Sequence, residues 1–279
     1  MDQERGRLRV INIAHRGARS LAPENTLVAA AKAQEVGADL WETDIGVSAD
    51  GQLILFHDDS LARTTDAQKR FPDRAPWYFT AFTLAELRTL DAGSWFVNAD
   101  PFGEIAAGQV SLAEQEAYHG EPIPSLREAL IFTRERDYRV NVELKQLPAP
   151  LQSFPLVERV LTLIDELGLT DQIVISSFVH EWLRELHARR PQIKIQALIG
   201  YSEQEPLDWG KLEFKSYNAR STLIDERQIR AVSQQGIAVN LFVVNEESQM
   251  RRFSAAGAAG LITDYPQRLA ALLHEGVKR

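Results

Sequence analysis

The chain has 279 residues, of which 44% are hydrophobic and 25% are charged. This composition is typical of a globular protein that is long enough to bury a large core. The formal net charge of −8 argues against a general binder of nucleic acid or of anionic membranes, although a local basic pocket is compatible with it. The absence of cysteine excludes disulfides, thiolate catalysis and cysteine-based zinc sites.

The N-terminal stretch "MDQERGRLRV" is charged and has no apolar core, so it does not resemble a secretory signal. No apolar run in the sequence approaches the roughly 18 residues that a membrane-spanning helix needs. We therefore expect a soluble, cytoplasmic protein without an integral membrane segment.

Short β-rich runs alternate with longer helical patterns along the chain. We predict strands at residues 9–15, 38–47, 52–57, 139–145, 172–178, 194–200, 214–219, 237–245 and 259–266. Predicted helices include residues 25–36, 125–137, 155–167, 180–190, 225–235 and 246–256. Alternation on this scale predicts βαβ units and a mostly parallel sheet, and the Val-, Ile- and Leu-rich strands are typical of strands buried on both faces.

The number of these units favours a closed (β/α)₈ TIM barrel. If residues 52–57 extend strand 38–47 as a hairpin, eight strands remain for the barrel. A doubly wound open sheet is the alternative. No Gly-x-Gly-x-x-Gly follows the first strand, so a dinucleotide-binding fold is not favoured.

Residues 59–120 interrupt the alternation with a segment rich in aromatic residues, Gly, Pro and Asp. This composition is compatible with an insertion packed over one end of the barrel or with an ordinary long loop that has its own small core. We expect a capping insertion after the second strand, within a single domain over residues 1–279.

Two predicted strands carry paired polar residues. Glu42 and Asp44 are two positions apart, so they share a face of strand 38–47. Glu143 and Lys145 share a face of strand 139–145 in the same way. Solvated carboxylates at a strand end and a plain Glu–Lys pattern on an edge strand are the simpler interpretations. A divalent cation would remove the repulsion of clustered carboxylates, and three carboxylates favour Mg²⁺ or Ca²⁺ over zinc.

Two histidines directly follow buried strands. His15 ends the run "VINIAH" and His57 ends "LILFH". A lone histidine of this kind is commonly a core or surface residue. Two of them at the carboxyl ends of barrel strands, where the active sites of such barrels lie, can serve as a general base and a general acid.

Together these residues indicate hydrolysis of a phosphodiester. Arg16 and Lys145 would bind an anion with delocalised charge, a metal would polarise the phosphoryl oxygen, and the histidines would move protons on either side. A Gly-rich phosphate loop and a Gly-x-Ser-x-Gly motif are both absent, which disfavours chemistry on nucleoside triphosphates and an α/β-hydrolase.

At this point the sequence resembles a known family. The motifs "AHRGARSLAPENT", "WETDIGVSADGQLILFHDDSLARTT", "NVELK", "SSF" and "GLITDYP", in this order over about residues 10–270, are similar to those of the glycerophosphodiester phosphodiesterase family. The combination is specific, although each piece alone is weak. The resemblance implies hydrolysis of glycerophosphodiesters, such as deacylated phospholipids, to glycerol 3-phosphate and an alcohol.

The resemblance also implies roles for the residues. His15 and His57 would be the general acid and base, in an order left open. Arg16 would contact the phosphate, and Lys145 would contact the phosphate or the metal-bound oxygens. Mg²⁺ or Ca²⁺ would be the cofactor, ligated by Glu42, Asp44 and Glu143.

Four further positions of this sequence bear on the comparison with the family. Glu24 and Asn25 of the "ENT" motif would help to order the site and the first helix. Asp58 would orient His57. Phe242 stands where the family commonly has Trp, so an aromatic contact there would be smaller.

The insertion would cover the glycerol side of the pocket, with Trp95 and Phe96 as the expected aromatic wall. A lysophospholipase D-like enzyme on the same scaffold is the alternative, because an aromatic insertion could also supply a channel for an acyl chain. A binding module without catalysis is disfavoured, because the complete set of candidate residues is present. We expect a small-molecule substrate and no nucleic-acid partner.

Overall fold

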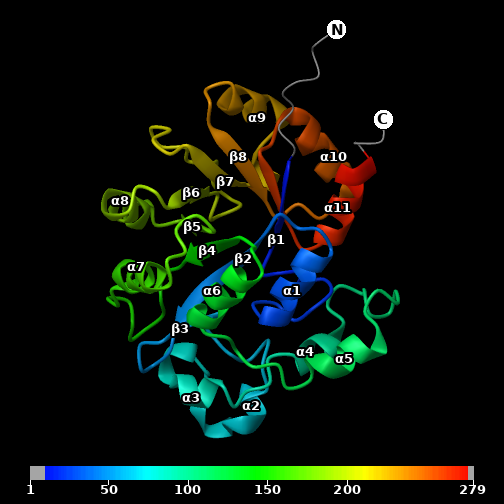
Figure 1. The fold of residues 1–279 in the computed structure, drawn as a ribbon, viewed down its shortest axis with the longest axis vertical. Coiled ribbons are helices and arrows are strands. Elements are labelled where there is room, and N and C mark those ends of the chain that lie inside the picture. Colours follow the sequence, from blue (N-terminus) through cyan, green and yellow to red (C-terminus); the bar gives the residue numbers. More distant parts are fainter. Residues whose placement is uncertain (1–9, 276–279) are drawn as a thin grey trace.

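A closed ring of parallel strands forms the centre of the molecule (Figure 1). The structure, a computed structural model, describes residues 10–275; residue 9 of the first predicted strand and most of the charged N-terminal stretch lie outside them. Within the described residues the strands follow the order β1-β9-β8-β7-β6-β5-β4-β2, and β2 pairs back with β1. The prediction of a (β/α)₈ barrel is therefore confirmed.

The eight barrel strands each have another barrel strand on both sides. Their bounds are β1 (Ile11–Ala14), β2 (Leu40–Val47), β4 (Val140–Leu144), β5 (Ile173–Ser177), β6 (Lys194–Ile199), β7 (Ser216–Arg220), β8 (Ala238–Phe242) and β9 (Gly260–Thr263). The remaining strand, β3 (Leu53–Leu55), pairs antiparallel with the end of β2. Residues 52–57 thus form the predicted hairpin extension, and the chain reverses before the insertion begins.

Helices on the outside of the barrel connect the strands. They are α1 (Leu27–Glu35), α6 (Leu126–Glu135), α7 (Leu156–Leu167), α8 (His180–Arg189), α9 (Glu226–Ser233), α10 (Glu247–Ala256) and α11 (Pro266–Glu275), with a short 3₁₀ helix η3 (Ser221–Leu223) before α9. Local sequence sets several of their ends. Ser125 and Glu128 form a capping box at the start of α6, and Gly168 ends α7 in a left-handed conformation.

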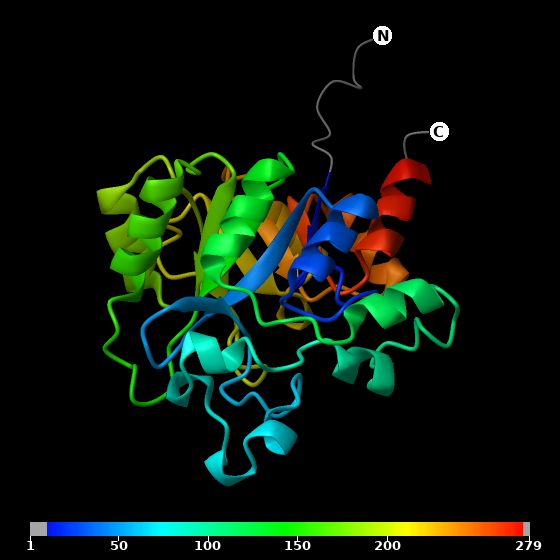
Figure 2. The same cartoon turned by 60° about the horizontal axis from the view of Figure 1, so that its bottom comes forward.

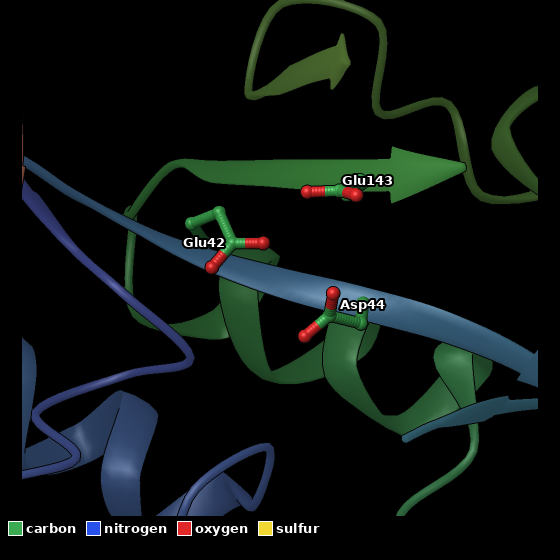
Figure 3. Close-up of side chains that lie close together, drawn as sticks. All are labelled: Glu42, Asp44 and Glu143. Atoms are coloured by element: carbon green, nitrogen blue, oxygen red, sulfur yellow. The ribbon is translucent and has the colours of Figure 1, made fainter. Parts of the chain in front are cut away.

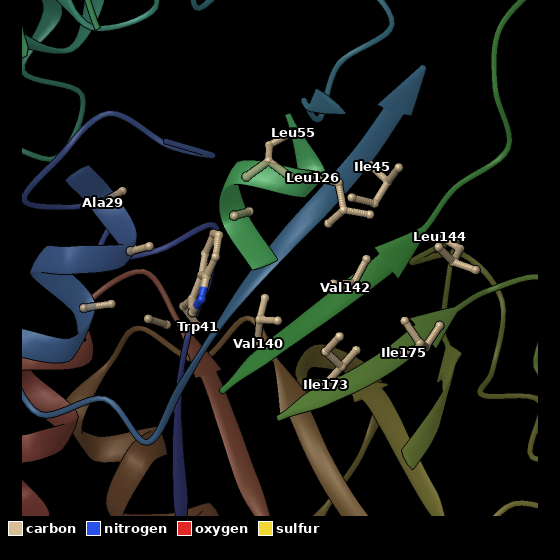
Figure 4. Close-up of a cluster of buried hydrophobic side chains, with 14 of the residues drawn as sticks. Ala29, Trp41, Ile45, Leu55, Leu126, Val140, Val142, Leu144, Ile173 and Ile175 are labelled. Atoms are coloured by element: carbon tan, nitrogen blue, oxygen red, sulfur yellow. The ribbon is translucent and has the colours of Figure 1, made fainter. Parts of the chain in front are cut away.

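The outward faces of the strands pack against these helices and form the main core (Figure 4). Trp41 is fully buried, and its ring meets Phe132 of α6 edge-on at 6.3 Å between centroids. Val140 and Ile173 on the neighbouring strands are also fully buried. Full burial of each such aliphatic side chain contributes about 1.5–3 kcal/mol, so this layer fixes the strands in position.

The interior of the barrel is apolar only in part. A small separate cluster consists of Ile13, Leu40, Val174 and Ile262. Side chains alternate along a strand, so Glu42 and Asp44 follow Leu40 on the inner face of β2. The barrel interior therefore turns polar toward the carboxyl ends of the strands.

The segment between β3 and α6 lies beside α1 and the ends of β2 and β3 (Figures 1 and 2). Its short helices are α2 (Ala67–Arg70), η1 (Pro72–Arg74), η2 (Phe79–Ala81), α3 (Leu84–Leu87), α4 (Ser94–Ala99) and α5 (Leu112–Tyr118). The Tyr118 hydroxyl donates a hydrogen bond of 3.0 Å to the carbonyl of Leu21, which follows β1. The segment is thus attached to the loop that leaves β1.

The turn after β1 depends on a glycine. Gly17 has φ +81°, and a Cβ at this position would lie 2.6 Å from the carbonyl carbon of Ala29 in α1. We expect Gly17→Ala to lower the free energy of unfolding by about 2–4 kcal/mol, measured by urea denaturation, because both backbone strain and overlap oppose it.

Gly108→Ala is the matched control, since Gly108 also has positive φ but no neighbour within 4 Å of its added Cβ. It should cost only the backbone strain of about 1–2 kcal/mol. Equal losses in the two variants would contradict the close approach of the turn to α1.

Candidate active site

Three carboxylates from two neighbouring strands meet inside the barrel (Figure 3). Asp44 of β2 is in register with Glu143 of β4, and Glu42 is two residues before Asp44 on the same face. Ligand oxygens of the three side chains lie within 4.8 Å of one another. Glu42 is 3% exposed and Asp44 is 2% exposed, so these acids are not solvated groups at a strand end. Because β4 pairs with both β2 and β5, Glu143 and Lys145 do not belong to an edge strand.

The crowding of these acids changes their pKa values. Burial, together with the charges of Asp44 and Glu143, raises the pKa of Glu42 well above its usual range. Burial and the neighbouring Asp44 raise the pKa of Glu143 to about 8. In the protein without a bound cation these interactions therefore disfavour the ionised forms of Glu42 and Glu143.

Asp44 is the acid that positive groups stabilise. Its Oδ2 lies 3.3 Å from Nε of Arg16, and its Oδ1 lies 3.5 Å from Nζ of Lys145. The side-chain amide of Asn25 donates to Oδ2 at 3.0 Å. Although burial opposes ionisation, Lys145 and Arg16 hold the pKa of Asp44 well below its usual range.

The donor set fits a hard divalent cation. All three groups offer carboxylate oxygens, which Mg²⁺ and Ca²⁺ prefer. Two oxygen ligands that each lie about 2.0–2.6 Å from one ion can be up to about 5 Å apart, and the 4.8 Å limit agrees with this. A cation would also offset the repulsion that raises the pKa values of Glu42 and Glu143.

His15 follows β1 and is held by an aspartate from the other end of the chain. Its Nδ1 lies 2.6 Å from Oδ1 of Asp264, directly after β9. The side-chain amide of Asn245 donates to the other oxygen of Asp264 at 2.8 Å, and the backbone N–H of Asp264 donates to Oδ1 of Asn245 at 3.0 Å. Burial and the neighbouring Arg16 lower the pKa of His15. A neutral His15 can therefore donate through Nδ1 to Asp264 and leave Nε2 free to accept a proton.

His57 is held in the same way by the next residue. Its Nδ1 lies 2.6 Å from Oδ1 of Asp58, and its backbone carbonyl accepts a hydrogen bond of 2.9 Å from Nζ of Lys145. Lys145 thus joins the His57 segment to Asp44. His57 is more open than His15, with 33% of its side chain exposed against 15%.

Arg16 lies in the turn between His15 and α1, with φ +54°. Its backbone N–H donates to Oε2 of Glu42 at 2.9 Å, and its Nη1 donates to Oε1 of Glu24 at 2.8 Å. Its Nε has no hydrogen-bond partner although it is buried beside Asp44. This guanidinium therefore lies next to the carboxylate cluster with a donor still available.

A small cleft opens at the carboxylate cluster. Its lining combines the site residues His15, Glu42 and Glu143 with apolar and polar side chains of other strands and loops, among them Asn218, Phe178 and Phe242. The rings of Phe178 and Phe242 meet edge-on at 6.0 Å between centroids. The lining of the cleft thus includes both charged side chains and a pair of aromatic rings.

The two aromatic residues expected in the pocket wall differ in placement. Phe96 is fully buried and meets the rings of Trp95 and Tyr118 edge-on, so its side chain belongs to the core of the insertion. Trp95 is half-buried, and Arg63 lies over its ring at 5.8 Å. Of this pair, only Trp95 reaches the surface.

Sequence reasoning missed Asp264 and Arg63, two of the partners that hold the site residues. Asp264 was not among the candidates, although it follows a buried strand, the signal that singled out His15 and His57. Arg63 in "LARTT" gave no local signal, yet it contacts both Asp58 and Glu24.

Within the described residues, no helix is both long and apolar enough to span a bilayer.

Comparison with known proteins agrees with this geometry. The Glycerophosphoryl diester phosphodiesterase family matches residues 15–268 of the chain. A glycerophosphodiester phosphodiesterase of Caldanaerobacter subterraneus subsp. tengcongensis is 30% identical over 271 residues, which cover 96% of this chain and 100% of that protein. One from Bacillus subtilis is also 30% identical and covers 92% of this chain and 84% of its own length.

Solved structures show the same architecture. A phosphodiesterase of Oleispira antarctica in complex with the product sn-glycerol-3-phosphate is 28% identical, with a TM-score of 0.74 over 94% of this chain and 96% of that one. The chain therefore belongs to the glycerophosphoryl diester phosphodiesterase family, a class of phosphoric diester hydrolases. The family indicated by the sequence motifs is confirmed.

The raised pKa of Glu143 gives a test of the carboxylate cluster. The usual pKa of this group is 4.5, and its folded-state pKa is about 8, so the folded protein binds this proton more tightly than the unfolded chain. Between those two values the stability of the cation-free protein falls as pH rises. We expect Glu143→Gln to be more stable than wild type in EDTA at pH 8, with the difference shrinking toward pH 5, measured by urea unfolding.

His15 contributes in the opposite direction, because its lowered pKa makes stability rise with pH. Wild type and Glu143→Gln both retain His15, so this contribution cancels when their stabilities are compared. Added Ca²⁺ or Mg²⁺ should stabilise wild type more than Glu143→Gln, because binding to the folded state alone adds to stability. A variant that is less stable than wild type in EDTA at every pH would show that the three carboxylates do not repel one another.

Proposed function

We propose that this protein hydrolyses glycerophosphodiesters to glycerol 3-phosphate and an alcohol, with a divalent cation held by Glu42, Asp44 and Glu143. The observation that carries the proposal is the cluster of three carboxylates, two of them buried and one half-buried, whose oxygens lie within 4.8 Å of one another. Two histidines, each held at Nδ1 by an aspartate at 2.6 Å, accompany it. The product complex of the Oleispira antarctica relative supports the substrate class.

The site residues have separate roles in the proposed hydrolysis. Arg16 and Lys145, which flank Asp44, bind the phosphodiester anion. One imidazole removes a proton from the attacking water as its oxygen bonds to phosphorus, and the other protonates the leaving alkoxide as its bond to phosphorus breaks. The lowered pKa of His15 keeps it neutral, and this form favours His15 as the base. When bound, Mg²⁺ or Ca²⁺ would polarise the phosphoryl oxygen and stabilise the negative charge that develops there.

The segment of residues 59–120 caps the pocket in this proposal. Its attachment to the loop after β1 through Tyr118, and the contact of Arg63 with Glu24, support this role. Trp95 would line the glycerol side of the pocket, and Phe96 would support it from the core. A cytoplasmic location remains part of the proposal.

The function is tested by assaying a panel of glycerophosphodiesters and a lysophospholipid after EDTA treatment, with Mg²⁺, Ca²⁺ or Mn²⁺ added back singly. We expect EDTA to abolish turnover, one or more of these ions to restore it, and glycerophosphocholine or a similar diester to be hydrolysed faster than the lysolipid. His15→Ala and His57→Ala should each lower kcat by about 10²–10⁴-fold, the usual contribution of a general acid or base.

Faster release of the head group from a lysolipid would instead favour the lysophospholipase D-like activity, to which the aromatic rings of Phe178 and Phe242 could contribute. Full turnover in EDTA, or in both histidine variants, would refute the proposal.

Substitutions of Trp95 and Phe96 should have different effects. Trp95→Ala should raise KM for glycerophosphodiesters with little loss of stability, because Trp95 is half-buried. Phe96→Ala should lower the free energy of unfolding by about 3–5 kcal/mol, as is usual for a fully buried ring. Steady-state kinetics and urea unfolding measure the two effects. An unchanged KM in Trp95→Ala would remove this residue from the pocket.

A further inference from the structure

A chain of alternating charges connects the two histidine–aspartate pairs. Asp58 holds His57, and Arg63 contacts Asp58. Arg63 also contacts Glu24, and Glu24 contacts Arg19. Arg19 lies 3.5 Å from Asp264, the partner of His15. The two candidate proton-transfer groups, from separate strands, thus belong to one network.

Arg63 makes two forked contacts in this network. Its Nε donates to Oδ2 of Asp58 at 2.6 Å, and its Nη2 donates to Oδ1 at 3.0 Å. Its Nη2 also donates to Oε1 of Glu24 at 2.7 Å, and its Nη1 donates to Oε2 at 3.1 Å. A planar guanidinium that binds two carboxylates at once restricts the orientation of both.

Glu24 is the buried carboxylate that links the arginines of this network. Its side chain is only 4% exposed, and it accepts hydrogen bonds from Arg16, Arg19 and Arg63. These partners outweigh burial and lower the pKa of Glu24 to about 2. A buried carboxylate with three guanidinium partners stays charged and ordered, so Arg63 is anchored to a rigid part of the barrel mouth.

Asp264 and Asp58 differ in how many other contacts hold them in place. Asn245 fixes both the side chain and the backbone of Asp264. Asp58 is more exposed, at 28% of its side chain against 10% for Asp264. Besides His57, the side-chain contact that holds Asp58 among the described residues is the fork of Arg63. Loss of Arg63 therefore frees Asp58, whereas loss of Arg19 leaves Asp264 held.

We propose that Arg63 is a positioning residue for the phosphodiesterase reaction: it locks Asp58, which in turn fixes the orientation and tautomer of His57. The inference rests on the proposed function, because it requires His57 to transfer a proton. It assigns a role to an arginine of the insertion that does not contact the carboxylate cluster. The alternative is a purely structural ion pair that attaches the insertion to the barrel.

The test compares the kinetics of four variants and a surface control. Wild type, Arg63→Gln, Asp58→Asn and the double variant form a double-mutant cycle, and Arg63→Lys is measured beside it. Arg63→Gln should lower kcat by about 10–100-fold, the usual cost of losing a group that orients a ligand or catalytic side chain, with KM within about twofold of wild type. Asp58→Asn should lower kcat at least as much. The double variant should lose no more than Asp58→Asn alone, because Arg63 acts through Asp58. Arg63→Lys keeps the charge but not the fork, so its kcat should lie between those of Arg63→Gln and wild type.

Arg190→Gln is the matched control. Arg190 makes the same kind of fork to Asp165, with contacts of 3.0 and 2.5 Å, on the exposed surface. Its loss should leave kcat unchanged. Circular dichroism checks that each variant is folded, and if Arg63→Gln is not, Arg63→Lys carries the cycle with Asp58→Asn. Arg19→Gln should lower kcat less than Arg63→Gln, because Asn245 also holds Asp264.

The outcomes separate the two proposals. If the losses from Arg63→Gln and Asp58→Asn multiply, or if Arg63→Gln changes only KM or stability, the positioning role is wrong while the phosphodiesterase function stands. If His57→Ala keeps wild-type turnover, the proposed function fails first. The inference is supported if Arg63→Gln lowers kcat and Arg190→Gln does not. The double variant must also lose no more than Asp58→Asn alone.

Discussion

The site depends on three carboxyl groups that lie close together in one small volume. Glu42, Asp44 and Glu143 lie inside the barrel, and the charged groups of Arg16 and Lys145 form ion pairs with Asp44. Burying ionised carboxylates without counter-charge costs several kcal/mol for each group, and the raised pKa values of Glu42 and Glu143 express that cost. A divalent cation bound among these oxygens would remove that cost.

The surrounding structure can be understood as support for this arrangement. The apolar layer outside the barrel fixes β2 and β4 in register, which sets Asp44 opposite Glu143. The turn after β1 brings the backbone of Arg16 to Glu42, and Gly17 allows that turn to pack on α1. The histidines come from β1 and from the end of the β2–β3 hairpin. Their orientation depends on the aspartates, because a ring nitrogen bonded to a carboxylate leaves the other nitrogen with a defined role.

Much of this could be predicted because it depends on local spacing. The two-residue period of a strand places Glu42 with Asp44, and Glu143 with Lys145, whatever the rest of the fold does. Parallel strands then bring those pairs to the same end of a barrel. The partner of His15 is different. Asp264 and His15 come from opposite ends of the chain, and only the pairing of β1 with β9 joins them. Phe96 and Trp95 are adjacent in a segment without clear periodicity, so no pattern in the sequence separates the buried ring from the half-buried one.

The central claim is that one cation binds among the three carboxylates. The most direct measurement is a crystal structure of the protein soaked with Mn²⁺, with the ion located by its anomalous scattering. We expect a single strong peak inside the barrel, at about 2.0–2.6 Å from oxygens of Glu42, Asp44 and Glu143. A peak bound elsewhere, with these three side chains turned away from one another, would contradict it.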